Sequence, residues 1–555
     1  MNVSMEEYTS LMHQAALSGS LDSIEMLLGM GLSANSQNPN EIQPLYCACE
    51  IDDEAVVKLL LERGAEPDAR GGFHETALQA ASYNGNMGAV KALLEKGAEV
   101  NIQGGYYGNS LQAAAFDGDE MVVKTLIEKG AEVNAQGGFY GNALQAAAYN
   151  GDETIVNILL ERGAEVNAQG GHYGNALQAA ANHGSDIVVR TLLDRGAEIN
   201  VQGGLRGNAL QAASLSGKEG VVMLLLDRGA EVNAHGGNFG SALQAASYSG
   251  NNALVNILLK KGANINAQGG LRGNALQAAA FVGHEMILKT LLEKGAEVNT
   301  RSGEYGNALQ AAAYNGNKTV ANILLEKGAK VNFQGGDYGN ALQAAAWGGN
   351  ETLVDFLLER GADVNAQGGR YRSALQAAAF SGNETIVKTL LERGAEINSS
   401  GGEFGAPLQA AVFSRNESLV DMLLEKGADV NITGGFGGSA LQAAAINGNE
   451  TMVKKLLEKG ADVNAEGGTF GSALQAAAAY GHEMVVKALI DKGANINAQG
   501  GLRGTALQAA AIAGDEIVVK LLLEKGADSS LGTEQATTQS KKFIESTKKR
   551  IAADL

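Results

Sequence analysis

The fold of this 555-residue chain is decided by residues 142–174, which read NALQAAAYNGDETIVNILLERGAEVNAQGGHYG. Asn142 stands three residues before Gln145, the spacing of a capping box, in which the two side chains satisfy free backbone N–H groups of the first helical turn. A first short helix is therefore expected to follow Asn142 and to stop at Gly151.

A second helix is predicted after this glycine. It opens with the acids Asp152 and Glu153, which suit the positive end of a helix dipole. Its apolar side chains recur at the helical spacing and mark one buried face, at Val156, Leu159 and Leu160. Arg162 and Gly163 end it, a base in the last turn followed by a glycine suited to the left-handed conformation. The unit is thus helix, turn, helix and a glycine-rich reversal.

This unit recurs every 33 residues. The leucine of its ALQAA segment returns at positions 78, 111, 144, 177, 210, 243, 276, 309, 342, 375, 408, 441, 474 and 507, and the same step back reaches Leu45 and Met12. Helices this short do not persist alone in water, so each must bury its apolar face against a neighbouring unit. The pattern predicts an all-α solenoid of about sixteen helix-turn-helix repeats, connected by β-turn fingers, over residues 1–528.

The repeat resembles that of the ankyrin family. The GAEVN segment at residues 130–134 is typical of the loop after the second helix, although Gln replaces the family's His in the fourteen later copies and only His13 keeps it. The GGxYGNALQAA form resembles ankyrin arrays of filamentous fungi. Such arrays often form the C-terminal part of multidomain sensor ATPases that resemble innate-immune receptors. The resemblance covers about residues 4–528. It implies a protein-binding scaffold whose first helices and fingers line a concave face.

Composition excludes several other functions. The chain has 42 basic and 61 acidic residues, a formal net charge of −19, and no basic block of the kind that binds nucleic acid. Its two cysteines and scattered histidines predict no metal site, and no segment has the phosphate-binding pattern GxxxxGK[ST]. No apolar run approaches membrane-spanning length. We therefore expect a non-enzymatic monomer without cofactors, in the cytoplasm or alternatively in the nucleus.

Two positions of the repeat are enriched in aromatic residues. Five residues after the marker leucine, nine of fourteen copies are aromatic, and a second position in the finger holds mostly Tyr, Phe or Arg. Such residues dominate binding hot spots. The candidate partner-binding residues are Tyr248, Phe281, Tyr314, Trp347, Phe380 and Phe413 in the helix position and Tyr305, Tyr338, Tyr371 and Phe404 in the finger position. The alternative is that these rings only stack on one another.

The glutamines of the ALQAA segments, from Gln79 to Gln508, also recur at the 33-residue period. They could bind a peptide backbone, but we favour a structural role in which each amide ties its own helix to the neighbouring loop. After residue 528 the repeat is lost. Residues 529–539 read as a polar linker, and residues 541–555 as a short basic helix with Phe543, Ile544, Thr547 and Ile551 on one side. This helix either caps the last repeat or forms a free tail.

The leading function hypothesis is a scaffold or adaptor that binds a partner protein or peptide in the concave groove. One alternative is the ligand-sensing half of a signalling ATPase. Another is an ankyrin-type transcriptional co-regulator.

Overall fold

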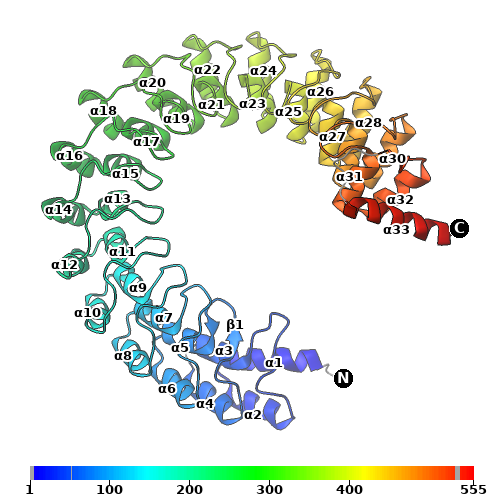
Figure 1. Cartoon of the computed structure of the whole chain (residues 1–555). Helices are drawn as coiled ribbons and strands as arrows, with labels where there is room; N and C mark the ends of the chain where they lie inside the picture. Colours follow the sequence, from blue (N-terminus) through cyan, green and yellow to red (C-terminus); the bar gives the residue numbers. More distant parts are fainter. Residues whose placement is uncertain (1–4, 52, 532–537, 555) are drawn as a thin grey trace. The chain divides into compact units, whose positions relative to one another are not determined.

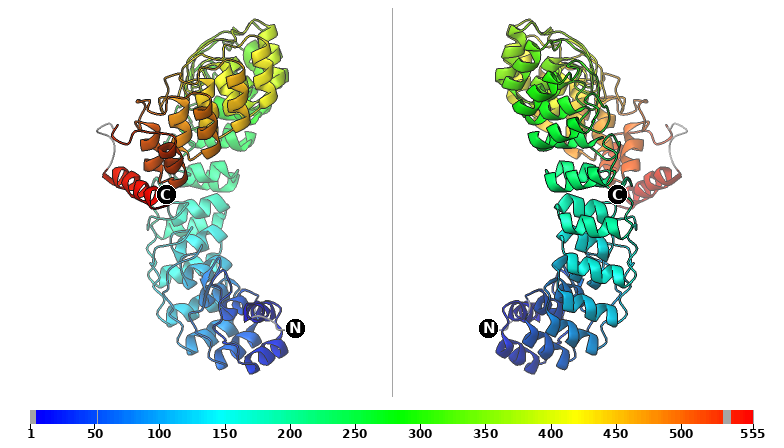
Figure 2. Two further views of the ribbon diagram at one scale, coloured as in Figure 1. Left: turned by 90° about the vertical axis from the view of Figure 1, so that its right-hand side faces the viewer. Right: turned by 90° about the vertical axis from the view of Figure 1, so that its left-hand side faces the viewer.

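The computed structural model describes residues 5–51, 53–531 and 538–554 (Figure 1). The chain divides into two compact units, Met1–Ala275 and Leu276–Leu555. Within each unit, short helices are arranged in pairs, one pair per repeat, and the pairs stack in layers (Figures 1 and 2). In each unit the first helices of the pairs line the inner side of the curve and the second helices line the outer side (Figure 1).

Unit 1 contains eight helix pairs and one small hairpin. Its first helices are α1 (Met5–Leu17), α3 (Pro44–Glu50), α5 (Ala77–Tyr83), α7 (Ser110–Asp117), α9 (Ala143–Asn150), α11 (Ala176–His183), α13 (Ala209–Leu215) and α15 (Ala242–Ser249). Its second helices are α2 (Leu21–Gly29), α4 (Glu54–Glu62), α6 (Met87–Glu95), α8 (Glu120–Glu128), α10 (Glu153–Glu161), α12 (Asp186–Asp194), α14 (Glu219–Asp227) and α16 (Asn252–Lys260). Strands β1 (Arg70–Gly71) and β2 (Glu75–Thr76) pair antiparallel.

Unit 2 repeats this arrangement and adds a C-terminal helix. Its first helices are α17 (Ala275–Val282), α19 (Ala308–Tyr314), α21 (Ala341–Trp347), α23 (Ala374–Ser381), α25 (Pro407–Phe413), α27 (Ala440–Asn447), α29 (Ala473–Ala479) and α31 (Ala506–Ala513). Its second helices are α18 (Glu285–Glu293), α20 (Lys318–Glu326), α22 (Glu351–Glu359), α24 (Glu384–Glu392), α26 (Glu417–Glu425), α28 (Glu450–Glu458), α30 (Glu483–Asp491) and α32 (Glu516–Glu524), followed by α33 (Thr538–Asp554). The predicted all-α repeat solenoid is confirmed.

The helix boundaries follow from local chemistry. In the repeat that begins at Asn142, the side-chain oxygen of Asn142 accepts the backbone N–H of Gln145 at 2.9 Å, which starts α9. Gly151 ends α9 with φ of 80°, and Gly163 follows α10 with φ of 87°, as expected for glycines in the left-handed region. Asp152 caps α10 by accepting the N–H of Ile155 at 3.0 Å.

The core of each unit lies between the helices of successive repeats. Ala146 and Ala147 of α9 are fully buried against α7 and α11, because small side chains let these helices approach closely. Val156 and Leu159 of α10 are also fully buried. Burial of one such aliphatic side chain contributes about 1.5–3 kcal/mol, so the stability of the array arises from contacts between neighbouring repeats.

The loop after each second helix folds into the segment that we call the finger, which for this repeat is residues 169–174. The backbone of Gly170 pairs with Gly174 in an antiparallel bridge, and equivalent bridges recur in other repeats. Fingers are also bonded to each other: the His172 N–H donates to the Phe139 carbonyl at 2.8 Å, and that of Phe139 to the Tyr106 carbonyl at 2.7 Å. Backbone bonding between repeats holds the fingers of each unit in register.

Helix α33 packs against α31 and α32 of the last repeat. Ile544 and Thr547 are buried in this contact, and the Arg550 guanidinium pairs with Glu516 at 2.7 Å. The helix begins three residues before the predicted Lys541. Residues 532–537 of the expected linker, and Leu555, lie outside the described residues.

Candidate functional site

The recurring glutamines join each first helix to the finger of the next repeat. The Gln145 side-chain amide donates to the carbonyls of Ala168, Gly170 and Gly174 at 3.3, 3.2 and 3.0 Å. Equivalent bonds from the side-chain nitrogen recur in every repeat from Gln79 to Gln475. Gln145 is 1% exposed, so its amide is out of reach of a ligand. The favoured structural role of these glutamines is confirmed.

The predicted capping box forms in only part of the array. The Gln211 side-chain oxygen accepts the backbone N–H of Asn208 at 2.6 Å, which completes the box. The Gln145 side-chain oxygen accepts no hydrogen bond and lies instead against Gly141, where an added Cβ would be 2.0 Å from it. The reciprocal half of the box predicted for Gln145 is therefore wrong. The backbone of the cap residue differs between the two repeats, since Asn142 has φ of −146° and Asn208 has φ of −94°.

The aromatic rings of unit 1 form a continuous stack that we call the unit 1 ladder. Helix-position and finger-position rings alternate, with successive centroids 4.8–5.1 Å apart, in the order Tyr83, Tyr107, Phe116, Tyr140, Tyr149 and Tyr173. His74 packs on Tyr83 at one end, and the Arg206 guanidinium lies 5.6 Å from the Tyr173 ring at the other. Tyr248, in the same unit, lies 5.0 Å from Phe239.

The other nine candidate residues form the unit 2 ladder. Its members are Phe281, Tyr305, Tyr314, Tyr338, Trp347, Tyr371, Phe380, Phe404 and Phe413. Tyr305 lies 5.0 Å from Phe281 and 5.2 Å from Tyr314, and the chain's single tryptophan, Trp347, stacks on Tyr371 at 4.5 Å. Each such ring pair contributes about 0.5–1.5 kcal/mol beyond the area it buries.

The candidate rings of the ladders differ in how deeply they are buried. Tyr305 and Tyr371, both in the finger position, are 3% and 5% exposed because each is packed between neighbouring rings. The remaining eight candidates are half-buried. The buried finger rings are packed between their neighbours, and the half-buried rings are partly accessible to solvent.

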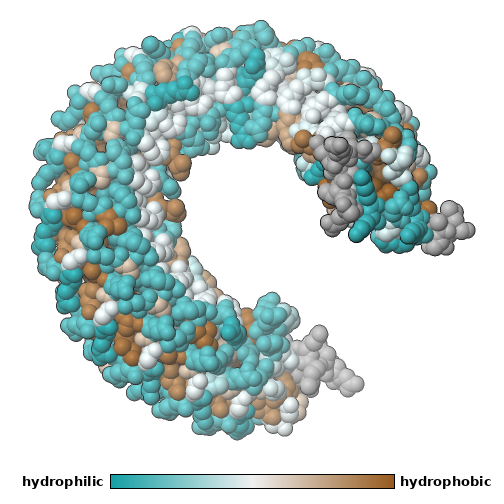
Figure 3. Space-filling view, viewed as in Figure 1, coloured by the Kyte–Doolittle hydropathy of each residue, from teal (hydrophilic) through white to brown (hydrophobic). Residues whose placement is uncertain are grey.

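The ladders carry no charge at neutral pH. Burial raises the pKa of the Tyr107, Tyr140 and Tyr338 phenols above the ordinary range, and it raises that of Tyr371 to about 12. Burial also lowers the pKa of His74 to about 4, which keeps its imidazole neutral. In Figure 3, residues of intermediate hydropathy line much of the inner rim of each unit, while hydrophilic residues cover most of the outer edge.

A third column of side chains was not recognised from the sequence. It lies at the finger tips, one residue before the finger position, where in unit 1 Tyr106 stacks 4.7 Å from Phe73 and 5.0 Å from Phe139. In unit 2 the same column is charged from Glu304 to Glu403, and Arg370 pairs with Glu403 at 2.9 Å. The 33-residue spacing that revealed the other two columns was sufficient to find this one.

Two further properties bear on the kind of site present. Among the described residues, no three or more His, Cys, Asp or Glu side chains are grouped so that they could hold a metal ion. No helix in the part of the chain that the structure describes is long and apolar enough to cross a bilayer.

Comparisons with known proteins identify the family. A family model described as ankyrin repeats (3 copies) matches residues 12–104 and, in overlapping segments, residues 110–533. No curated protein matches the chain. Among solved structures, the human ASB11 ankyrin repeat domain is 28% identical, covering 40% of this chain and 98% of that domain, with a TM-score of 0.36. The family match spans most of the chain, which therefore belongs to the ankyrin repeat family, whose repeats are generally protein–protein interaction modules.

Proposed function

We propose that this chain is a non-enzymatic scaffold that binds a partner protein or peptide on the inner face of its repeats. The observation that carries the proposal is the pair of aromatic ladders, whose half-buried rings belong to the first helices and the fingers. Rigid aromatic side chains supply a large contact area at low conformational cost.

The electrostatic character of this face favours a polypeptide over a polyanion. At the helix position and the residue after it, the fourteen later repeats carry one charged side chain, Asp117. Burial raises the pKa of its carboxyl group. The chain as a whole has a net charge of −19, which opposes the approach of nucleic acid. The half-buried aromatic rings remain as the groups that a partner meets.

A matched pair of variants tests the proposal. Ser381 lies at the exposed end of α23 on the inner side, and Thr385 is exposed on α24 of the same repeat on the outer side. A partner captured by the wild-type protein should be retained by the Thr385→Arg variant and lost by the Ser381→Arg variant, because a long cation beside Phe380 obstructs the inner face. Thermal melting and circular dichroism would establish that both variants fold. Equal capture by the two folded variants would contradict binding at this part of the face.

A further inference from the structure

Arg206 interrupts the run of aromatic rings in the finger position of unit 1. Tyr140 and Tyr173 occupy this position in the two preceding repeats, with ring centroids 6.2 Å apart, and Phe239 occupies it in the next repeat. The Arg206 guanidinium lies 5.6 Å from the Tyr173 ring, so it continues the stack as a cation. A positive charge therefore stands in the row of side chains to which we assign partner binding.

This cation has no anionic partner in the part of the chain that the structure describes. The Arg206 side chain is half-buried, and its Nε atom is buried without a hydrogen-bond acceptor. Across residues 5–51, 53–531 and 538–554, no carboxylate or carbonyl oxygen accepts a hydrogen bond from its guanidinium. A guanidinium that has lost part of its hydration and has no counter-ion gains more from a carboxylate than a fully hydrated one does.

An equivalent arginine of unit 2 is satisfied within the chain. Arg503 occupies the same finger position, and its guanidinium donates to the Ala479 carbonyl, 24 residues before it, at 3.2 Å. Asn182 has this offset from Arg206, but the described structure has no such bond between them. The Asn182 side chain instead accepts the Ser216 hydroxyl at 2.7 Å. The unpaired guanidinium is therefore particular to Arg206 and is not a general property of the finger position.

The fingers around Arg206 carry no negative charge. Six successive fingers, from residues 103–108 to residues 268–273, contain two residues of the Asp, Glu, Lys and Arg types, and both are arginines, Arg206 and Arg272. Burial and the Arg206 charge lower the pKa of His172, so this imidazole adds no further cation at neutral pH. A single guanidinium between aromatic neighbours fits one carboxylate, whereas phosphate sites gather several cations.

We infer that Arg206 is a specificity-determining residue that binds an Asp or Glu side chain of the partner polypeptide. This inference rests on the proposed function and specifies the chemistry that the inner face of unit 1 selects. The planar guanidinium offers two parallel N–H groups to a carboxylate while it remains stacked on Tyr173. Leu205, the adjacent finger-tip residue, is 52% exposed and offers an apolar contact beside the charge. The preferred ligand is thus a peptide segment with one acidic residue next to apolar ones.

Peptide selection tests this inference. A phage-displayed library of random dodecapeptides would be panned on the immobilised full-length wild-type protein and on its Arg206→Gln and Arg206→Glu variants. We expect the wild-type protein to enrich peptides with Asp or Glu beside apolar residues. The Arg206→Gln variant should lose this acidic preference, and the Arg206→Glu variant should select Lys or Arg instead. A merely structural arginine would not produce such a reversal.

Calorimetry measures how much the charge contributes. A synthetic peptide from the wild-type selection is expected to bind the Arg206→Gln variant about tenfold more weakly, the loss typical of a hydrogen bond to a charged group. The same peptide with Asn or Gln in place of its acidic residue should bind both proteins equally.

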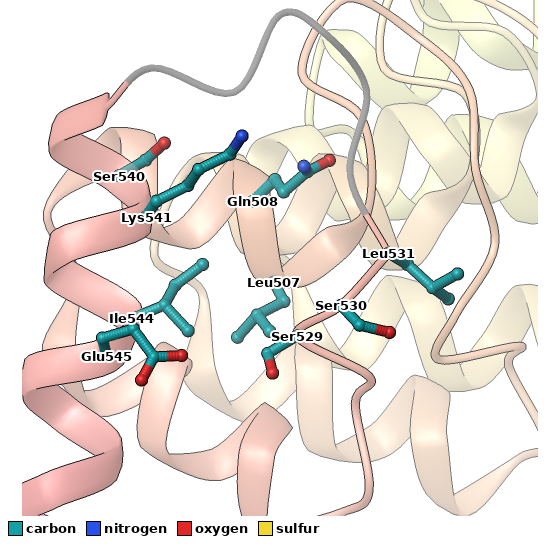
Figure 4. Close-up of a pocket in the computed structure, with 9 residues that line it drawn as sticks. All are labelled: Leu507, Gln508, Ser529, Ser530, Leu531, Ser540, Lys541, Ile544 and Glu545. Carbon is teal, nitrogen blue, oxygen red and sulfur yellow. The ribbon is translucent and has the colours of Figure 1, made fainter.

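Two control variants remove a positive charge elsewhere. Arg228 follows α14 and pairs with Asp194 at 2.9 Å, and Lys541 is exposed on α33 of unit 2 (Figure 4). The Arg228→Gln and Lys541→Gln variants should keep the wild-type peptide preference. Circular dichroism and thermal melting would establish that all four variants fold.

Several outcomes would overturn the inference. They are a failure of the wild-type protein to enrich any peptide, enrichment without acidic residues, an acidic preference that survives Arg206→Gln, and an equal loss of that preference in the charge controls. The proposed function is tested separately, because the Ser381 and Thr385 variants lie in unit 2 and leave Arg206 unchanged.

Discussion

At the scale of single residues, Gln145 shows how one side chain joins two repeats. Its amide group donates to three carbonyls of the following finger, while its oxygen lies against the Gly141 backbone. Removing this buried donor would leave the Ala168 and Gly170 carbonyls without it, while the Gly174 carbonyl would keep the Gly170 N–H. Loss of a donor shared by several acceptors costs more than one ordinary hydrogen bond.

Replacing Gln145 by Glu should lower the opening free energy of its repeat by about 3 kcal/mol or more, because a buried carboxylate would face three carbonyl oxygens. Native-state hydrogen exchange measures this value. A loss below about 1 kcal/mol would contradict the assigned role of the glutamines.

Two glycines with similar backbone angles should differ in their tolerance of alanine. Gly141 has φ of 101° and Gly163 has φ of 87°, but a Cβ at Gly141 would lie 2.0 Å from the Gln145 oxygen, whereas nothing lies within 4 Å at Gly163. Gly163→Ala should cost about 1–2 kcal/mol for the left-handed conformation. Gly141→Ala should cost clearly more, as measured by urea unfolding. A smaller effect at Gly141 would show that the close contact is absent.

At the scale of elements, the ladders join helices to fingers. Each buried finger ring, such as Tyr305, contacts the helix rings of two neighbouring repeats. The position of α19 relative to the next finger likewise depends on ring packing, between Tyr314 and Tyr338, as well as on the Gln310 bonds.

The buried tyrosines of the ladders should make the free energy of unfolding fall at alkaline pH. Burial raises the pKa of Tyr371 from its ordinary 10 to about 12, so the folded state holds this proton more tightly than the unfolded state does. The resulting stabilisation is complete below pH 10 and is lost as the pH rises from 10 to 12. The Tyr371→Phe variant should lose less stability than the wild-type protein over this interval, as measured by urea unfolding at each pH. Parallel losses in both proteins would contradict a buried phenol.

Much of this element-level structure was predictable from the sequence. The glycines, caps and apolar spacing around Asn142 placed α9 and α10, and the repeat period placed the glutamines and both aromatic columns. The burial of Tyr305 and Tyr371 was not predictable, because it depends on how far a finger inserts between the rings of adjacent repeats.

At the scale of the whole molecule, stability is a sum over repeats and their neighbours. Interactions between repeats are short in range, because each Gln amide and each finger reaches only the next repeat along the chain. A defect in one repeat should therefore remain local.

The Gln145→Glu variant tests this locality. Its hydrogen-exchange protection should fall in α9, α11 and the adjoining fingers, while protection of α23 to α29 in unit 2 should stay at the wild-type level. Loss of protection throughout both units would instead show that the array unfolds as one cooperative block.

Binding on the inner face is tested most directly by site-specific photo-crosslinking. A photoreactive phenylalanine analogue would replace Ser381 on the inner side or Thr385 on the outer side of one repeat, and both full-length proteins would be irradiated in native extract. The proposed function predicts a defined partner polypeptide crosslinked from position 381 and absent from position 385. Equal labelling at both positions, or labelling from position 385 alone, would contradict binding on the inner face.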